Sequence, residues 1–247
     1  MPHAIVRELV GLEPLKTWSL IVTLLGDLEG ETLTGAEVRA LLEPIGIKPE
    51  AIRVAFHRLK SDGWVVSRKS GREAVYGLTA MALRETRLVR ADIYDRHPKY
   101  PDGWRIHVTR GGAVPDDGVQ IAKDVALVPV RPGQGKTDAL ILKFDGKAVP
   151  AWVEEALVPA HLLQTARALT RLHAAAEAGP AQLSTEDRAS LRILTLHHWR
   201  RVALRPGSWA HMFLLPDGTI AQCRGTVTAY LGKSDNASTF LKLSAGA

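Results

Sequence analysis

Short apolar helical patterns, separated by strong stop signals, limit the fold of this chain more than any other feature of its sequence. From Pro14 to Leu28, apolar residues recur at three- and four-residue spacing, which predicts a first helix. Thr34 and Glu37 have the spacing of a capping box, so a second helix is expected to begin there and to end before Pro44. Pro49 suits the first turn of a third helix, where its missing N–H group costs nothing. Three short helices in series are therefore expected.

A basic β-hairpin is expected directly after the third helix. Gly63 ends that helix, and the β-type runs Trp64–Ser67 and Ala74–Leu78 flank a turn. Between Lys48 and Arg72, the chain has seven basic residues against the two acids Glu50 and Asp62, and the bases are Lys48, Arg53, Arg58, Lys60, Arg68, Lys69 and Arg72. Three helices followed by a hairpin is the order of a winged helix-turn-helix, whose third helix enters the DNA major groove.

The third helix is expected to have an apolar and a polar face. With a rotation of about 100° per residue, Ile52, Phe56 and Leu59 share one face. The remaining surface and the hairpin supply the residues that we expect to bind double-stranded DNA, namely Glu50, Arg53, Val54, His57, Arg58, Lys60, Lys69 and Arg72. Arginine can pair with guanine and with phosphates. A merely solvated helix surface is the alternative that the pattern leaves open.

The whole chain is expected to have an α+β fold in three domains. A fourth helix from Thr79 to Ile93 closes a DNA-binding domain of residues 1–95, and a break follows at Pro98–Gly103. Residues 100–150 form a small α+β domain, and residues 151–247 form a mainly helical one.

The middle domain is expected to contain short strands and one short helix. The strands are predicted at Trp104–Val108, Val125–Val130 and Ala139–Phe144, and the helix at Val119–Asp124. In the last domain, a long helical pattern from Trp152 to Ala178 is interrupted at Pro159, and a further helix begins at Ser184. The tail from Met212 to Leu243 has no clear type, because glycines interrupt its apolar runs.

The motifs of the first domain resemble those of a known family. They are Trp18-Ser19-Leu20-Ile21-Val22-Thr23, Leu42-Glu43-Pro44-Ile45-Gly46-Ile47, Ile52-Arg53-Val54-Ala55, Arg58-Leu59, Asp62-Gly63-Trp64, Gly71-Arg72, Tyr76-Gly77-Leu78-Thr79, Ile93-Tyr94-Asp95 and Gly103-Trp104-Arg105. This series is similar to that of the PaaX-type regulators of phenylacetic acid catabolism. The resemblance is strongest over Leu15–Val108.

The resemblance implies a dimeric repressor of a catabolic operon that binds operator DNA through its winged helix. It also implies a ferredoxin-like middle domain, related to Cas2 folds, and a helical C-terminal domain. The founding members of the family are released from DNA by an aryl-acyl-CoA thioester, so a small acidic effector is expected here. Arg53 and Arg58 match the basic positions of the family's recognition helix, and Lys69 and Arg72 fall on its wing. Trp18 and Trp64 also match, and we expect both to pack in the core.

A second basic cluster offers a place for the effector. Arg200, Arg201 and Arg205 lie close in sequence to Trp209. Arginines recognise phosphates and carboxylates, and an aromatic ring can stack on an adenine or aryl ring, so an acyl-CoA could dock here. A dimer face or a solvated helix side is an equally good interpretation of the same residues.

Two other function classes are considered, and neither is favoured. A Cas2-like metal-dependent nuclease needs an aspartate at the end of the first middle-domain strand, where Thr109 and Arg110 stand. A winged helix used only for protein contacts would not give salt-dependent DNA binding. The Gly133–Thr137 stretch resembles the end of a phosphate-binding loop, but Val130 occupies the position of its first glycine. No catalytic residue, metal site or cofactor is therefore expected.

The expected location is the cytoplasm. The longest apolar stretches are far shorter than the roughly 18 residues that span a bilayer. Cys223 is the single cysteine, and a chain with one cysteine cannot form an intramolecular disulfide, which fits a reducing compartment.

Overall fold

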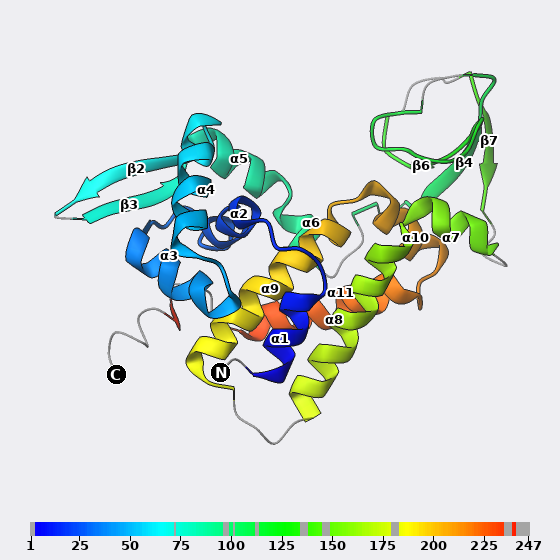
Figure 1. Cartoon of the computed structure of the whole chain (residues 1–247). Coiled ribbons are helices and arrows are strands. Elements are labelled where there is room, and N and C mark those ends of the chain that lie inside the picture. Colours follow the sequence, from blue (N-terminus) through cyan, green and yellow to red (C-terminus); the bar gives the residue numbers. More distant parts are fainter. Residues whose placement is uncertain are drawn as a thin grey trace. The chain divides into compact units, whose positions relative to one another are not determined.

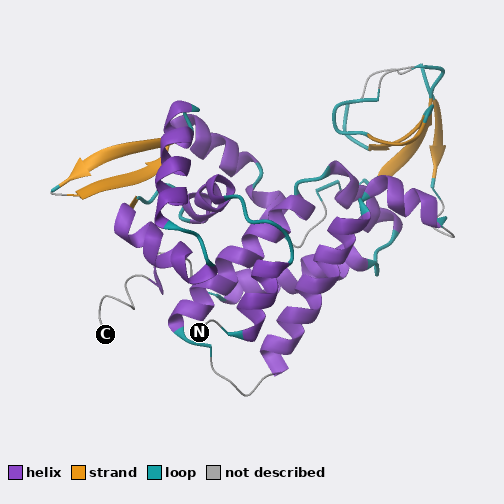
Figure 2. Ribbon diagram, viewed as in Figure 1, coloured by secondary structure: helices purple, strands orange, loops and turns teal. Residues whose placement is uncertain are grey.

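The protein is an assembly of helices with two small antiparallel sheets (Figures 1 and 2), so the α+β class is confirmed. The computed structural model describes residues 3–71, 73–95, 99–100, 102–111, 114–133, 138–144, 149–178, 183–234 and 239–240. The chain divides into two compact units. The first contains residues 1–91, 171–198 and 229–247, and the second contains residues 92–170 and 199–228. Each unit is thus built from separate stretches of sequence.

The N-terminal part of the first unit contains the predicted helices and hairpin. Its elements are α1 (Ala4–Gly11), α2 (Thr17–Asp27), β1 (Leu33–Thr34), α3 (Gly35–Leu42), the 3₁₀ helix η1 (Glu43–Ile45), α4 (Pro49–Ser61), β2 (Val65–Ser70), β3 (Glu73–Leu78) and α5 (Ala80–Leu88). The three strands form one antiparallel sheet in the order β1-β3-β2. The expected helix Thr79–Ile93 is divided, because α5 ends at Leu88 and α6 (Arg90–Tyr94) follows.

Local signals in the sequence explain where these elements begin and end. The Thr34 hydroxyl accepts a hydrogen bond from the Glu37 N–H at 3.1 Å, and the Glu37 carboxylate accepts one from the Thr34 N–H at 2.6 Å. This capping box fixes the start of α3. Gly71 turns the hairpin with φ +62°, in the left-handed region that glycine adopts without strain. Apolar residues of α2, including Leu20 and Ile21, are fully buried in the core of this unit.

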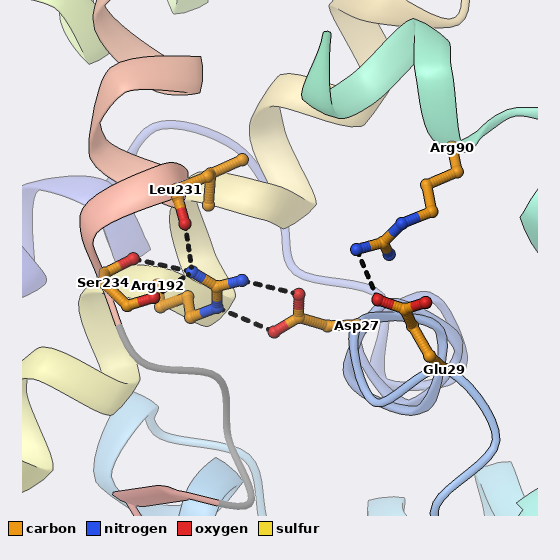
Figure 3. A network of polar contacts seen from close by, with 6 residues as sticks. All are labelled: Asp27, Glu29, Arg90, Arg192, Leu231 and Ser234. Atoms are coloured by element: carbon orange, nitrogen blue, oxygen red, sulfur yellow. Dashed lines mark hydrogen bonds and ion pairs between the residues drawn. The ribbon is translucent and has the colours of Figure 1, made fainter.

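A buried ion pair joins distant parts of the first unit (Figure 3). Arg192 lies on α9 (Thr185–Ala203) and donates from Nε to Asp27 Oδ2 and from Nη2 to Asp27 Oδ1, both at 2.8 Å. Its third nitrogen, Nη1, donates to the carbonyl of Leu231 at 3.2 Å and to the Ser234 hydroxyl at 2.6 Å. Both charged side chains are almost completely buried. Every nitrogen of this guanidinium therefore has an acceptor, as a buried charge requires.

The second unit contains a four-stranded antiparallel sheet. Its strands are β4 (Trp104–Val108), β5 (Val119–Ala122), β6 (Val125–Pro129) and β7 (Leu140–Lys143), in the order β5-β6-β4-β7. The predicted helix at Val119–Asp124 is wrong, because this segment forms β5 and the turn that leads to β6. In β5, Val119 and Ile121 are less exposed than Gln120 and Ala122, which is the alternation of a half-buried strand.

The connections between these strands bear on the predicted ferredoxin-like domain. That fold alternates strands and helices in the order βαββαβ. Between Trp104 and Lys143, the described residues form strands and turns without a helix. The ferredoxin-like part of the prediction is therefore not confirmed.

The described elements that follow β7 are helices. They are α7 (Ala151–Leu157), α8 (Ala160–Ala178), α9, α10 (Pro206–Leu214) and α11 (Thr219–Lys233). The break between α7 and α8 falls at Pro159, as predicted. The described part of the tail that the sequence left without a type is thus largely helical. Glycine at position 207 allows α10 to approach Leu157 of α7 closely, because a Cβ atom there would lie 2.0 Å from the carbonyl oxygen of Leu157.

Candidate nucleic-acid interface

Helix α4 has the two faces that its sequence predicts. Ile52, Ala55, Phe56 and Leu59 are buried. The Phe56 ring stacks on Tyr76 of β3, with ring centroids 4.0 Å apart, and this contact fixes the helix against the sheet. All six predicted DNA-binding residues of the helix are exposed on its other side, namely Glu50, Arg53, Val54, His57, Arg58 and Lys60. Their contact with DNA stays a prediction.

A groove of about 530 Å³ lies beside the exposed face of α4. Its walls come from α3, α4 and β3, and Phe56 and Tyr76 form part of its lining. Four basic side chains line the groove, namely Arg39, Arg53, His57 and Lys60, together with the two acids Glu50 and Glu73. Arg39, which is exposed on α3, is not among the residues predicted to bind DNA. Its position could have been inferred, because the helix before a recognition helix crosses the DNA backbone.

The two arginines of α4 have different surroundings. Arg58 Nε lies 3.6 Å from Asp62 Oδ2, and its guanidinium lies over the ring of Trp18 at 5.9 Å from the centroid. Trp18 is 39% exposed, so the expectation that it packs in the core is only partly right. Among the described residues, Arg53 has no ion-pair partner. Arg53 is therefore the arginine that is better placed to form a new contact.

The hairpin presents basic side chains near its turn. Arg68 and Lys69 are exposed on β2, where Lys69 pairs with Ala74 across the hairpin. Arg72, the other predicted contact of the hairpin, lies outside the described residues. Exposed bases thus continue from α4 to β2 within the same unit.

The predicted effector residues are not equally accessible. Arg201 and Arg205 are exposed, whereas Arg200 is half-buried, and burial lowers the pKa of Arg200 from its ordinary value. Trp209 is buried, and its ring lies against the guanidinium of Arg224, which the sequence analysis did not single out. A ligand could therefore reach Arg201 and Arg205 more easily than the ring of Trp209.

The described residues show no arrangement typical of a metal or thiol enzyme. Within the described ranges, no group of three or more His, Cys, Asp or Glu side chains could hold a metal ion. Cys223 is buried, and the loss of solvation raises the pKa of its thiol to about 12. Gln134–Thr137, which includes most of the stretch that resembles a phosphate-binding loop, lies outside the described residues. Among the described helices, none is long and apolar enough to cross a membrane.

The fold and the site together define a class of protein, an α+β protein with a basic helix-and-hairpin surface beside a groove. Residues 16–82, which carry this surface, match the model of the family described as PaaX-like protein. The chain is also 32% identical over 111 residues to the transcriptional repressor PaaX of Escherichia coli (strain K12). The predicted resemblance to PaaX-type regulators is confirmed over this segment.

The coverage of the match sets how far the comparison extends. It spans 43% of this chain and 35% of the relative, so the chain matches about a third of that protein's length. The remaining parts of the two proteins are not compared by this match.

Proposed function

We propose that this protein is a DNA-binding transcriptional repressor. One observation carries the proposal: the exposed basic face of α4 and the basic strand β2 lie within the segment that matches the PaaX-like family. In the proposed arrangement, α2, α3, α4 and the β2–β3 hairpin act as a winged helix-turn-helix within residues 1–95. Helix α4 enters the major groove, and the hairpin touches the flanking phosphates.

The charge of this surface supports DNA as the partner. Arg53, His57 and Lys60 line one groove, and Lys69 adds a base on the hairpin. Bound cationic side chains displace counterions from the duplex, and this release favours association. Arg53 can also form a bidentate contact with a guanine edge, which gives the surface a means to read sequence.

The finer parts of the proposal concern regulation. The repressor acts in the cytoplasm as a homodimer on an operon for aromatic catabolism, such as phenylacetate degradation. A small acidic effector, for which acyl-CoA thioesters are the first candidates, releases it from the operator. These parts rest on the resemblance of residues 16–82 to PaaX-like proteins and on the arginines Arg200, Arg201 and Arg205.

Selection of DNA by the protein tests the proposal without knowledge of the operator. The full chain is incubated with a random duplex library, bound sequences are amplified, and the enriched duplex is used in fluorescence anisotropy. We expect one enriched motif, bound more tightly than random duplex and more weakly as salt rises. The variant Arg53→Ala should lose the preference for the motif, whereas Arg167→Ala, which changes an exposed arginine of α8, should keep it. No enrichment, together with salt-independent binding, would favour a protein-interaction module instead.

A further inference from the structure

A second buried arginine in the protein has only part of the partners that a buried guanidinium needs. Arg224 lies on α11 and is 3% exposed. Its Nη1 donates to the carbonyl oxygen of Asp95 at 2.9 Å. Within the described part of the chain, its Nε and Nη2 are buried and have no hydrogen-bond acceptor. Buried polar groups of native proteins nearly always have partners, so two such donors on one charged group call for an explanation.

Two tryptophan rings hold this guanidinium in place. Its central carbon lies 3.9 Å from the ring centroid of Trp209 and 5.1 Å from that of Trp199. The indole Nε1 of Trp199 donates to the carbonyl of Ile93 at 2.9 Å, whereas Nε1 of Trp209 is buried without an acceptor among the described residues. Three donors without partners therefore belong to one stacked pair of side chains, Arg224 and Trp209.

The Arg192 pair shows which chemical group would satisfy these donors. Arg192 and Arg224 both use Nη1 for a backbone carbonyl. Arg192 uses its other two nitrogens, Nε and Nη2, for the two oxygens of the Asp27 carboxylate (Figure 3). The nitrogens left open in Arg224 are this same pair, which forms the edge of the guanidinium that matches a carboxylate in two parallel hydrogen bonds. The open edge of Arg224 therefore has the geometry of a carboxylate site.

We infer that Arg224, whose guanidinium lies over the rings of Trp209 and Trp199, binds the carboxylate group of a small ligand. The site lies wholly within the second unit. The ligand's two oxygens accept from Nε and Nη2 of Arg224, and the apolar part of the ligand lies among aromatic side chains. Because the donors are buried in this structure, surrounding side chains move when the ligand enters. The inference rests on the proposed function for a small acidic effector. It points to a free carboxylic acid held at Arg224 instead of an acyl-CoA thioester held at Arg201 and Arg205, because a thioester has no carboxylate.

Nuclear magnetic resonance of the full chain without DNA tests the site directly. The indole N–H signals of the six tryptophans are recorded, and the signal lost in Trp209→Phe identifies Trp209. Benzoate is titrated, with benzamide as the uncharged control of the same shape and inorganic phosphate as a second oxyanion. We expect benzoate to shift the Trp209 signal to saturation and benzamide to leave it unchanged. A saturating shift with phosphate alone would overturn the assignment to a carboxylate.

Variants assign the effect to the open edge of Arg224. Arg224→Lys keeps the charge but not the fork, so benzoate affinity should fall at least about tenfold. Arg167→Gln removes an exposed arginine of α8, also in the second unit, and should change affinity by less than about twofold, as expected for a charge that the ligand does not contact. Equal benzoate affinity of Arg224→Lys and the parent, or no saturable shift in the parent, would overturn the inference. Neither result affects the DNA proposal, since no DNA is present.

If Arg224→Lys does not fold, Trp209→Phe still tests the site. This variant keeps an aromatic ring against the guanidinium and removes only the indole N–H group. Benzoate binding, followed by calorimetry, should weaken without being lost. Complete absence of benzoate binding by both the parent and Trp209→Phe would contradict a carboxylate site.

Discussion

At the scale of single side chains, the two arginines of α4 differ in what already engages them. Arg58 must leave Asp62 and the Trp18 ring before it can contact another group, and both members of its ion pair are exposed. An exposed ion pair contributes little to stability, so breaking the contact between Arg58 and Asp62 costs little free energy. Arg53 needs no such exchange and shares its groove with Arg39 and His57. The two positions should therefore contribute differently to sequence recognition.

We expect Arg53→Ala to weaken binding to the selected motif by about 1–3 kcal/mol while changing binding to random duplex less. Lys69→Ala should weaken binding to both duplexes alike, because the hairpin is proposed to contact phosphates, which carry no sequence information. Fluorescence anisotropy with the two duplexes at one salt concentration measures both effects. Equal losses on both duplexes for Arg53→Ala would show that Arg53 does not read bases.

The Asp27–Arg192 pair gives a prediction about stability. Arg192→Met removes the partner of a buried carboxylate, so the free energy of unfolding should fall by about 3–5 kcal/mol. The double variant Asp27→Leu, Arg192→Met removes both charges and should recover part of this loss. Urea denaturation followed by circular dichroism measures all three proteins. If the double variant is less stable than Arg192→Met, the pair must stabilise the fold by more than the neutralisation of each charge by the other.

At the scale of elements, the sequence predicts burial and exposure correctly where they depend on the periodicity of a single helix. The sides of α4 follow from its own periodicity, so the burial of Ile52 and Phe56 and the exposure of Arg53 could be predicted. The segment that forms β5 is only four residues long, and so short an apolar pattern fits a strand or a helix equally well. Its pairing with β6 decides its structure, and that pairing is not visible in the segment itself.

The stacking of Arg224 could not be predicted for a related reason. Its backbone partner, Asp95, is 129 residues away in sequence. The sequence places Arg224 between two glycine-containing stretches without a helical pattern, so neither its burial nor its partners are indicated. Trp209 was singled out for its ring, but only packing shows which cation covers that ring.

Close packing of α7 and α10 gives a prediction for two glycines. A Cβ atom at Gly207 would lie 2.0 Å from the Leu157 carbonyl oxygen, so Gly207→Ala must displace one of the two helices. We expect a loss of at least about 2 kcal/mol in the free energy of unfolding. Gly225→Ala on α11 is the matched control, since nothing lies within 4 Å of the added atom. It should stabilise the protein by about 0.5–1 kcal/mol. Thermal melting of Gly207→Ala and Gly225→Ala tests both expectations. Similar melting temperatures of the two variants would contradict the predicted close contact.

The contact of α8 with α9 predicts a dependence of stability on pH. His173 Nε2 lies 3.0 Å from the Thr195 hydroxyl, and its ring is 4.4 Å from that of Tyr230. Burial lowers the pKa of His173 to about 4 from its ordinary value near 6.5. Between these values the unfolded chain binds a proton that the folded protein does not, so the free energy of unfolding falls as the pH falls.

For His173 this loss should reach up to ~3 kcal/mol between pH 6.5 and pH 4. His173→Gln should show a shallower decline, although other buried histidines keep some slope in the variant. Urea denaturation at a series of pH values gives the comparison. Parallel curves for the parent and His173→Gln would mean that His173 does not contribute to acid sensitivity.

At the scale of the whole molecule, DNA binding should be strongly electrostatic. Each neutralised phosphate contributes about −0.9 to the slope of log K against log salt, so a dimer with several such contacts loses orders of magnitude in affinity over a modest salt increase. The enriched motif should be an inverted repeat with half-sites about one helical turn, or a multiple of it, apart. Footprinting and sedimentation test these points together. An asymmetric single site bound by a monomer would contradict them.

The residues of the first unit come from both ends of the chain, and this has a consequence for the time at which the unit can form. Asp27 and Arg192 are 165 residues apart. At synthesis rates of about 5–20 residues per second, the carboxylate is made roughly 10–30 s before the guanidinium that will neutralise it. Until then α2 carries an acid without its partner at a position that the finished protein buries, so its final packing must wait. The residues proposed to read DNA are made early, whereas the acceptors Leu231 and Ser234 that complete the contacts of Arg192 are made only near the end of translation.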